Sequence, residues 1–169
     1  YNVDSLVTRT VHPNGNVTEY VYQLAIDPAS PWRTRGNLRE RHQKPGTHSP
    51  PGDQSELVES FEYLPGSGGC CGVDLVTREV DARGHETLHT YDTAGNRIHT
   101  QHRIASVVED WEYDAFGRKT AHLLPDNGSA HRRRDELHYY GPADGAQNGY
   151  LKEKDANFTG EDVREGLTA

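Results

Sequence analysis

The chain has 169 residues, enough for one domain or at most two small ones, and a formal net charge of −8. Only 33% of the residues are hydrophobic, while 17 glycines and 9 prolines favour many short strands joined by turns over a thick core. The acidic balance argues against general binding to nucleic acid, and no apolar stretch approaches the length of a membrane span.

The first third of the chain is predicted to form irregular hairpins. Residues 5–23 read as two strands on either side of the turn sequence at residues 13–16, and a second turn is expected at Gly36. Residues 42–54 are rich in proline, glycine and serine, so they are expected to form a surface loop. A further strand is expected to end near Gly66.

Residues 66–72 are predicted to form a glycine-rich loop that holds the only cysteines, Cys70 and Cys71. Adjacent cysteines rarely bridge each other, because the resulting ring is strained. Four interpretations stay open: a redox-active vicinal disulfide, a soft-metal site, crosslinks to another chain, and a plain pair of loop thiols. The sequence offers no second cysteine pair of the kind that zinc sites use.

Residues 73–128 carry the strongest repeats. Glycines recur at multiples of eleven residues, each with an aspartate two or three residues earlier; the pairs are Asp81 and Gly84, Asp92 and Gly95, Asp114 and Gly117, and Asp126 and Gly128. Such a pair is typical of a tight turn, because the carboxylate accepts backbone N–H groups and glycine adopts a positive φ at low cost. The intervening residues have the length of a strand. We therefore predict an all-β fold of consecutive antiparallel β-hairpins, each about 22 residues long.

The strands of this region are expected to have two distinct faces. Within residues 106–114, Trp111 and Tyr113 should share one face with Glu109, while Asp110 lies on the other. We expect the aromatic residues Tyr91, Trp111 and Tyr113 to build a stacking layer, since cross-strand aromatic pairs stabilise sheets by roughly 0.2–1 kcal/mol each.

The last part of the chain is less regular. The basic run at residues 131–134 is followed directly by Asp135 and Glu136, so a solvated loop is favoured over a nucleic-acid patch. Gly149 is predicted to precede a strand at residues 150–154. The tail, residues 157–169, is ambiguous: it reads equally as one short helix or as the start of another hairpin.

Two segments carry a family resemblance. The sequences YDTAGNR at residues 91–97 and YDAFGRK at residues 113–119 resemble the YD repeats of RHS-type proteins, a group that includes bacterial polymorphic toxins, the shell components of Tc toxins, and teneurins. The resemblance implies a long sheet that spirals into a shell, to which this chain would contribute a handful of hairpins as a fragment or short member. It also implies a secreted or cell-surface location, and further YD-repeat strands of the same or neighbouring chains as partners.

Three functional hypotheses follow. The first is a structural YD-repeat segment of a β-shell that encloses, carries or displays a cargo such as a toxin effector. The second is an extracellular binding or adhesion module that recognises glycans or a partner protein through exposed aromatic faces, with Trp111 as the residue to test. The third is an accessory subunit of a larger enzyme or metalloprotein complex, with the loop of Cys70 and Cys71 reaching the partner's site.

The sequence gives no indication of enzymatic chemistry of its own. It has no nucleophile elbow, no phosphate-binding loop and no Cys–His pairing by motif, and the regularly spaced aspartates are explained as turn residues. The ten histidines lack the spacing of metal ligands, so they are expected on sheet faces or on the surface. We therefore predict no catalytic, cofactor-binding or metal-binding residues.

Overall fold

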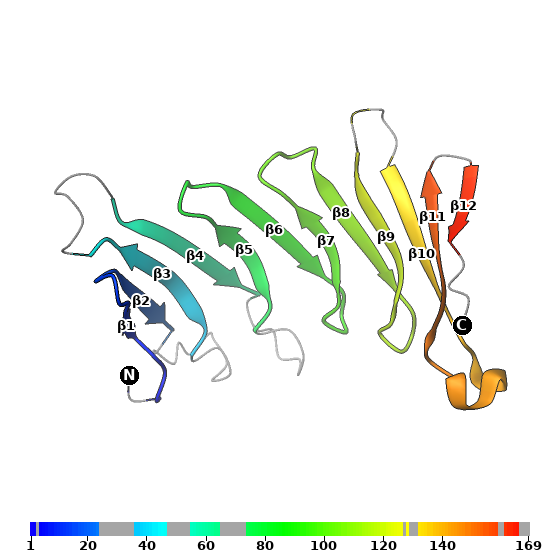
Figure 1. The fold of residues 1–169 in the computed structure, drawn as a ribbon, viewed down its shortest axis with the longest axis horizontal. Helices are drawn as coiled ribbons and strands as arrows, with labels where there is room; N and C mark the ends of the chain where they lie inside the picture. Colours follow the sequence, from blue (N-terminus) through cyan, green and yellow to red (C-terminus); the bar gives the residue numbers. More distant parts are fainter. Residues whose placement is uncertain are drawn as a thin grey trace. The chain divides into compact units, whose positions relative to one another are not determined.

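The computed structural model describes residues 1–2, 4–23, 36–46, 55–64, 74–126, 128, 132–158 and 161–165. In these residues twelve β-strands follow one another in sequence order and pair antiparallel, which confirms the prediction of an all-β fold of consecutive hairpins (Figure 1). The strands are β1 (Arg9–Val11), β2 (Val17–Tyr22), β3 (Leu38–Lys44), β4 (Leu57–Tyr63), β5 (Val76–Val80), β6 (Glu86–Tyr91), β7 (Arg97–Gln101), β8 (Val108–Tyr113), β9 (Lys119–Asp126), β10 (Arg132–Tyr139), β11 (Leu151–Phe158) and β12 (Glu161–Glu165).

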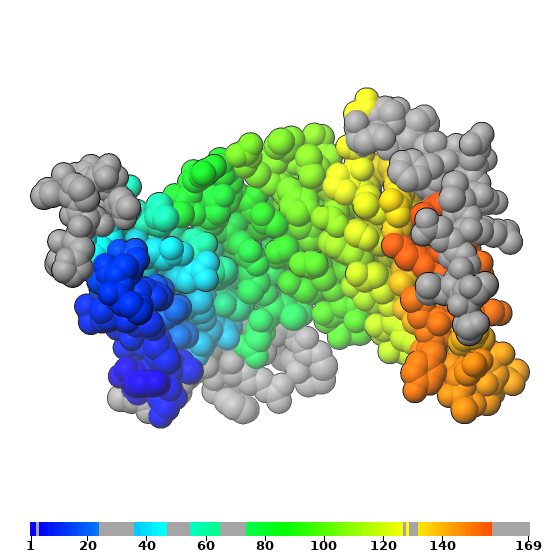
Figure 2. Space-filling model, viewed as in Figure 1, coloured from blue at the N-terminus to red at the C-terminus, as the bar shows by residue number. Residues whose placement is uncertain are grey.

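The chain comprises two compact units, Tyr1–Leu88 and His89–Ala169. Within each unit, strands that are consecutive in sequence also follow one another across the visible surface (Figure 2). One 3-10 helix, η2 (Pro142–Gln147), interrupts this pattern between β10 and β11. Because all connections join neighbouring strands, every pairing within a unit is local in the sequence, as expected for a repeat array.

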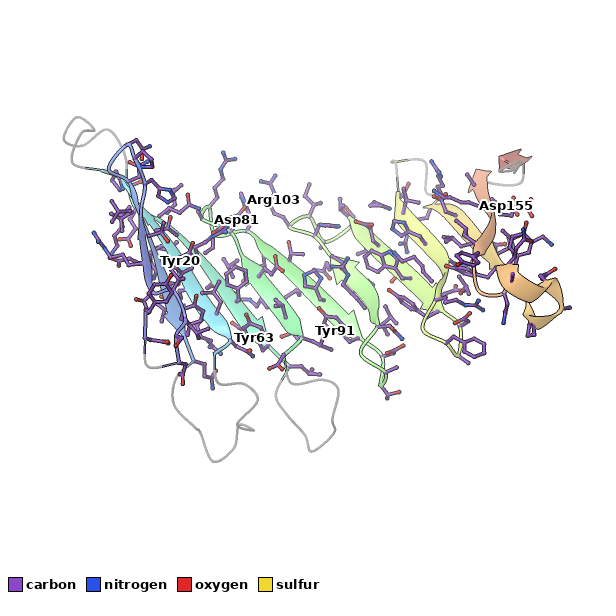
Figure 3. The ribbon with its side chains drawn as sticks, turned by 60° about the horizontal axis from the view of Figure 1, so that its bottom comes forward. Tyr20, Tyr63, Asp81, Tyr91, Arg103 and Asp155 are labelled. Carbon is purple, nitrogen blue, oxygen red and sulfur yellow. The ribbon has the colours of Figure 1, made fainter. Side chains whose placement is uncertain are left out.

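The sheet of each unit has very little apolar core. Among the described residues, Trp111 and Ala121 are the buried hydrophobic ones, whereas Thr18, Thr100 and Asp135 are buried and polar. Side chains project from both faces of the strands (Figure 3), and most strand positions are half-buried. Ladder hydrogen bonds and contacts between neighbouring strands therefore stabilise the sheet, rather than burial against a second layer.

The predicted surface loop at residues 42–54 begins later than expected. Strand β3 continues to Lys44, which lies opposite Val17 of β2 and binds the carboxylate of Glu19 at 2.5 Å. Lysine has a low intrinsic preference for strands, but pairing with β2 extends the strand to Lys44. Residues 47–54 lie outside the described part of the chain.

The basic run does not form a loop. Residues 132–134 belong to β10, and their guanidinium groups each bind an acid: Arg132 binds Asp110, Arg133 binds Asp135, and Arg134 binds Glu112. Sequence alone could not show that Asp110 and Glu112 of β8 lie within reach of Arg132 and Arg134 of β10. The pairing neutralises the charge that a phosphate backbone would otherwise meet.

The tail adopts the hairpin alternative as far as it is described. Strand β11 extends to Phe158, and β12 (Glu161–Glu165) pairs with it in antiparallel register, with Ala156 opposite Val163. The glycine-rich segment at residues 66–72, with Cys70 and Cys71, lies outside the described residues.

Candidate functional site

The Asp-x-x-Gly segments lie at reversals of the chain, and their side chains build the turns. In each, one carboxylate oxygen of the aspartate accepts the backbone N–H groups two and four residues later, at 2.8–3.0 Å; the aspartates are Asp81, Asp92 and Asp114. The glycine three residues on has φ between +76° and +90° and donates its N–H to the carbonyl of the aspartate. These bonds, the one from the His85 N–H foremost, lower the pKa of Asp81 to about 2.

The fourth predicted pair is built differently. Asp126 is the last residue of β9, and its carboxylate accepts the N–H of Gly128 at 2.9 Å, with Gly128 at φ +93°. At the grid position filled by Ser106, the chain reverses between His102 and Val107 without a glycine. The two reversals therefore share the spacing of the repeat but not its turn geometry.

The same turn also occurs at the start of the chain, where the sequence analysis did not predict it. The side-chain oxygen of Asn2 accepts the N–H groups of Asp4 and Leu6 at 3.0 and 2.9 Å, and Ser5 takes the glycine position at φ +61°. The signal was present in the sequence: Tyr1-Asn2 differs from Tyr-Asp only by an amide in place of a carboxylate. A pattern that requires aspartate and glycine does not match this segment, which has Asn2 and Ser5 at those positions.

Six of the nine tyrosines directly precede a reversal of the chain, and in each unit these reversals lie along one edge of the sheet. We call them tyrosine turns; they follow Tyr1, Tyr22, Tyr63, Tyr91, Tyr113 and Tyr139. The turn at Asp81 follows Val80 and lies at the opposite edge of the first unit from Tyr63 (Figure 3). Successive turns alternate between the edges because the strands form a meander. The eleven-residue spacing is thus half of a structural repeat.

The hydroxyls of four of these tyrosines make the same hydrogen bond. Each donates to the carbonyl two residues after the glycine position of the preceding tyrosine turn; the pairs are Tyr22 to Val7 at 2.9 Å, Tyr63 to Leu38 at 2.8 Å, Tyr113 to Arg97 at 3.0 Å, and Tyr139 to Lys119 at 2.7 Å. We call these bonds the tyrosine hydrogen bonds. Burial raises the pKa of the Tyr22, Tyr63 and Tyr113 phenols, which keeps them protonated as donors.

Consecutive tyrosine turns of the second unit lie close to each other. A Cβ placed on Gly117 would lie 3.7 Å from the side-chain oxygen of Asn96, and one on Gly149 would lie 3.7 Å from the Arg118 guanidinium. The Arg118 guanidinium carbon also lies 4.5 Å from the centre of the Tyr139 ring, within the range of a cation–π contact. In the motif Tyr-Asp-x-x-Gly-(Asn/Arg), the Asp and Gly therefore form the turn, while the Tyr and the last residue contact neighbouring turns.

We expect Tyr113→Phe to lower the free energy of unfolding by about 1 kcal/mol, because the Arg97 carbonyl loses its donor while the ring stays in place. Urea denaturation of the full chain measures the change. Tyr20→Phe is the matched control: the Tyr20 ring stacks on Tyr22 at 6.4 Å, and no described contact engages its hydroxyl. Equal losses in the two variants would contradict a role for the tyrosine hydrogen bond.

The second unit has an aromatic cluster centred on Trp111. Its ring stacks on His122 at 5.2 Å with 13° between the planes, and the Arg97 guanidinium lies 4.6 Å from its centre. Lys119 approaches the same ring at 5.5 Å. Trp111 is therefore only 7% exposed, whereas Phe116 at the adjacent turn is 83% exposed. The stacking contact of Trp111 is thus with a histidine, and Tyr113 acts through its hydroxyl.

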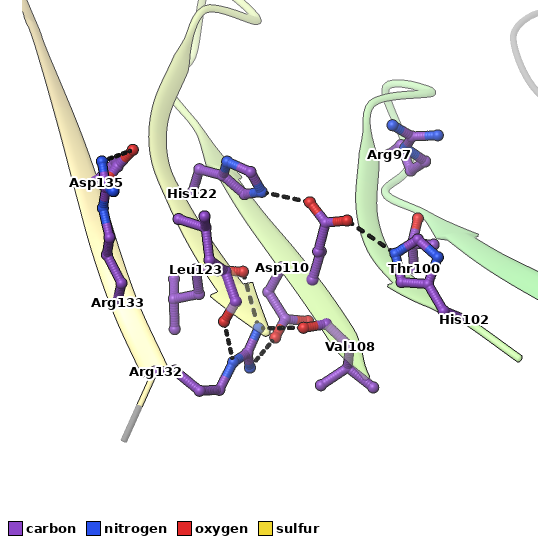
Figure 4. Close-up of polar contacts among 12 residues, drawn as sticks. Arg97, Thr100, His102, Val108, Asp110, His122, Leu123, Arg132, Arg133 and Asp135 are labelled. Atoms are coloured by element: carbon purple, nitrogen blue, oxygen red, sulfur yellow. Dashed lines mark hydrogen bonds and ion pairs between the residues drawn. The ribbon is translucent and has the colours of Figure 1, made fainter. Parts of the chain in front are cut away.

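Charged side chains contact one another on both faces of the sheet in the second unit. The two oxygens of Glu109 lie 2.8 and 2.7 Å from Nε2 of His102 and His122 (Figure 4). On the other face, Asp110 binds Arg132, whose guanidinium also donates to the carbonyls of Val108 and Leu123 (Figure 4). These contacts place Glu109 and Asp110 on opposite faces, in line with the predicted alternation.

The first unit also has a histidine that contacts two carboxylates. His42 lies between two carboxylates, with Nε2 2.8 Å from Glu40 and Nδ1 2.7 Å from Glu56. Each of the eight described histidines contacts a carboxylate or a threonine hydroxyl; they are His12, His42, His85, His89, His99, His102, His122 and His138. In the described part of the chain, no three potential ligands converge in a way that would hold a metal ion.

The histidine–carboxylate contacts predict a pH dependence of stability. The Glu40 and Glu56 carboxylates raise the pKa of His42, so its contribution is complete below its ordinary pKa of about 6.5 and is lost as the pH rises through the folded value. Burial raises the pKa of Glu109, but the hydrogen bonds from His102 and His122 outweigh it and lower that pKa. The contribution of Glu109 is therefore present above its ordinary pKa of about 4.5 and is lost as the pH falls through the folded value.

We therefore expect the free energy of unfolding to be greatest between about pH 5 and pH 6.5, and to fall as the pH rises beyond that range. Urea denaturation between pH 4 and pH 8 measures the profile. His42→Gln should flatten its alkaline side, while His138→Gln, at a more exposed site, serves as the comparison. A wild-type profile that keeps rising to pH 8 would contradict this assignment.

Comparison with known proteins identifies no family for the chain. No family model matches the sequence, and no curated protein is significantly similar to it. In the part of the chain that the structure describes, no helix has the length and apolar character needed to cross a membrane.

Proposed function

We propose that the chain is a structural array of YD repeats, and that it forms part of a β-shell that encloses, carries or displays a cargo such as a toxin effector. The recurrence of the tyrosine hydrogen bond supports this most directly. It couples consecutive tyrosine turns at an equivalent position in both units. An array held by nearest-neighbour contacts can be lengthened one repeat at a time, as a shell wall requires.

The polar faces of the sheet support a wall rather than a compact globular domain. Ion pairs occur on both faces of the second unit, and the first unit has similar pairs, such as Arg78 with Glu62 and Glu86. A globular domain instead buries one face of its sheet against another layer. We propose a secreted or cell-surface location on the resemblance to the RHS-type proteins.

Strand β1 offers a place where further repeats can join. The bonds from Tyr20 N–H to Thr8 and from His12 N–H to Asn16 alternate along the β1–β2 pair. The N–H groups of Arg9 and Val11 therefore point away from β2, and Val11 is 57% exposed. Among the described strands, β1 pairs with β2 alone. Such an edge recruits further strands, here YD-repeat strands of the same or neighbouring chains.

Sedimentation velocity over a hundredfold range of protein concentration tests the proposal. We expect the wild-type chain to form larger species as the concentration rises, and Val11→Lys to suppress them, because an edge lysine hinders strand addition. Val58→Lys is the control, since Val58 is also exposed, at 39%, but lies in β4 between β3 and β5. A wild-type chain that stays monomeric with a sharp, concentration-independent melt would overturn the proposal.

A binding module is the second candidate. Trp111 is 7% exposed and leaves little ring surface for a ligand, so this residue does not support the role. A polar groove in the first unit does, because it combines open hydrogen-bonding groups with apolar surface.

A further inference from the structure

A groove of about 510 Å³ lies in the first unit, beside the turn at residues 12–16 and the ends of β2, β3 and β4. This volume falls within the range of small-molecule sites. The polar side chains that line it include Asn14, Thr18, Gln43 and Ser55, and Leu57 contributes apolar surface. It lies apart from the tyrosine turns, and Lys44 is the lining residue that takes part in ion pairs.

One wall of the groove is held by close packing. A Cβ on Gly46 would lie 2.5 Å from the carbonyl carbon of Gly15, so only glycine allows the two backbones to approach this closely. The N–H of Gly46 donates to the side-chain oxygen of Asn16 at 2.8 Å. At the base, Nε2 of His12 lies 2.8 Å from the hydroxyl of Thr18, which is 9% exposed. These contacts hold the described residues of this wall in place.

The electrostatics of the groove favour an uncharged ligand. Lys44 is the one basic or acidic side chain, apart from His12, among the described residues that line it. Its ammonium lies 2.5 Å from Glu19 and 3.9 Å from Glu56, so its charge is already compensated. The described lining contains no carboxylate for a cation and no uncompensated positive charge for a phosphate or carboxylate.

The remaining polar groups match a ligand rich in hydroxyls. Amides and hydroxyls both donate and accept, as the hydroxyl of a sugar does. Gln43 is exposed, and its amide makes no hydrogen bond to another described residue. Leu57, which is 45% exposed, and the two prolines at positions 13 and 45 offer apolar surface for C–H groups. We propose that this groove binds a neutral saccharide.

The test begins with the full chain on an array of neutral oligosaccharides, with sialylated and sulfated glycans as the comparison. The neutral glycan that binds best is then titrated by calorimetry into wild-type protein, Gln43→Ala and Ser55→Ala. We expect each variant to lose at least tenfold in affinity, because a hydrogen-bonding group is removed from the site. Gln101→Ala, a matched change on β7, should bind as the wild type does.

The proposal is overturned if no neutral glycan binds, if only the acidic glycans bind, or if Gln43→Ala and Gln101→Ala retain equal affinity. Far-UV circular dichroism shows that each variant is folded, and the exposure of Gln43 makes misfolding unexpected. The outcome does not bear on the shell proposal, because sedimentation of the glycan-free chain tests that separately.

Discussion

Trp111→Ala is expected to lower the free energy of unfolding by about 3 kcal/mol, the largest effect of any single substitution considered for this chain. Trp111 is the one large hydrophobic residue among the described positions that is buried, at 7% exposure. Its removal opens a cavity between His122 and Arg97, both of which lose the ring they contact. Urea denaturation of the full chain, followed by circular dichroism, measures the loss.

Phe116→Ala provides the contrast, because it removes an aromatic ring that is 83% exposed. We expect a change within about 0.5 kcal/mol. Comparable losses in the two variants would show that burial of Trp111 contributes little. The same comparison bears on ligand studies: loss of binding in Trp111→Ala would have to be separated from loss of folding.

Gly117→Ala is expected to lower the free energy of unfolding by about 1–2 kcal/mol. Gly117 has φ +76°, a left-handed conformation in which a Cβ crowds the adjacent carbonyl. The added methyl group itself has room, since it would lie 3.7 Å from the Asn96 oxygen in ordinary contact. The loss would therefore come from the backbone and not from a clash between neighbouring turns.

Ser5→Gly tests the same explanation with the opposite sign. Ser5 occupies the equivalent position at φ +61°, and glycine relieves the steric cost there. The greater freedom of glycine in the unfolded chain offsets part of this gain, so we expect a net increase of about 0.5–1 kcal/mol. A loss of stability in Ser5→Gly, or no loss in Gly117→Ala, would show that the left-handed conformation is not what selects glycine in these turns.

The local turn chemistry was predictable from the sequence for a physical reason. An aspartate that caps its own turn acts over four residues, so Asp92 and Gly95 carry the whole signal within one short segment. Strand length and alternation are equally local, which is why Glu109 and Asp110 were placed on opposite faces. The structure differs from the prediction where contacts between residues distant in the sequence determine the local structure. Strand β3 continues to Lys44 because it pairs with β2 there, with Lys44 opposite Val17.

The role of the tyrosines could not be predicted in the same way. The strand pattern predicts a stacking role for Tyr113, whereas in the structure its hydroxyl donates to the carbonyl of Arg97, sixteen residues earlier. That partner is a backbone atom, which leaves no residue type for a pattern to detect. The acceptor becomes visible only when β7 and β8 are paired in register. The groove beside Gln43 is similar, because its walls come from segments thirty residues apart, joined through Asn16 and Gly46.

The sequence by itself determined the all-β class, the hairpin repeat and the turns at Asp81, Asp92 and Asp114, because each depends on hydrogen bonds and backbone torsions within a few residues. Only the tertiary structure decided which turns share an edge, that Trp111 is buried beneath His122, and that the arginines of β10 are neutralised. These features depend on the register between strands, and register is set by pairings that no single segment contains.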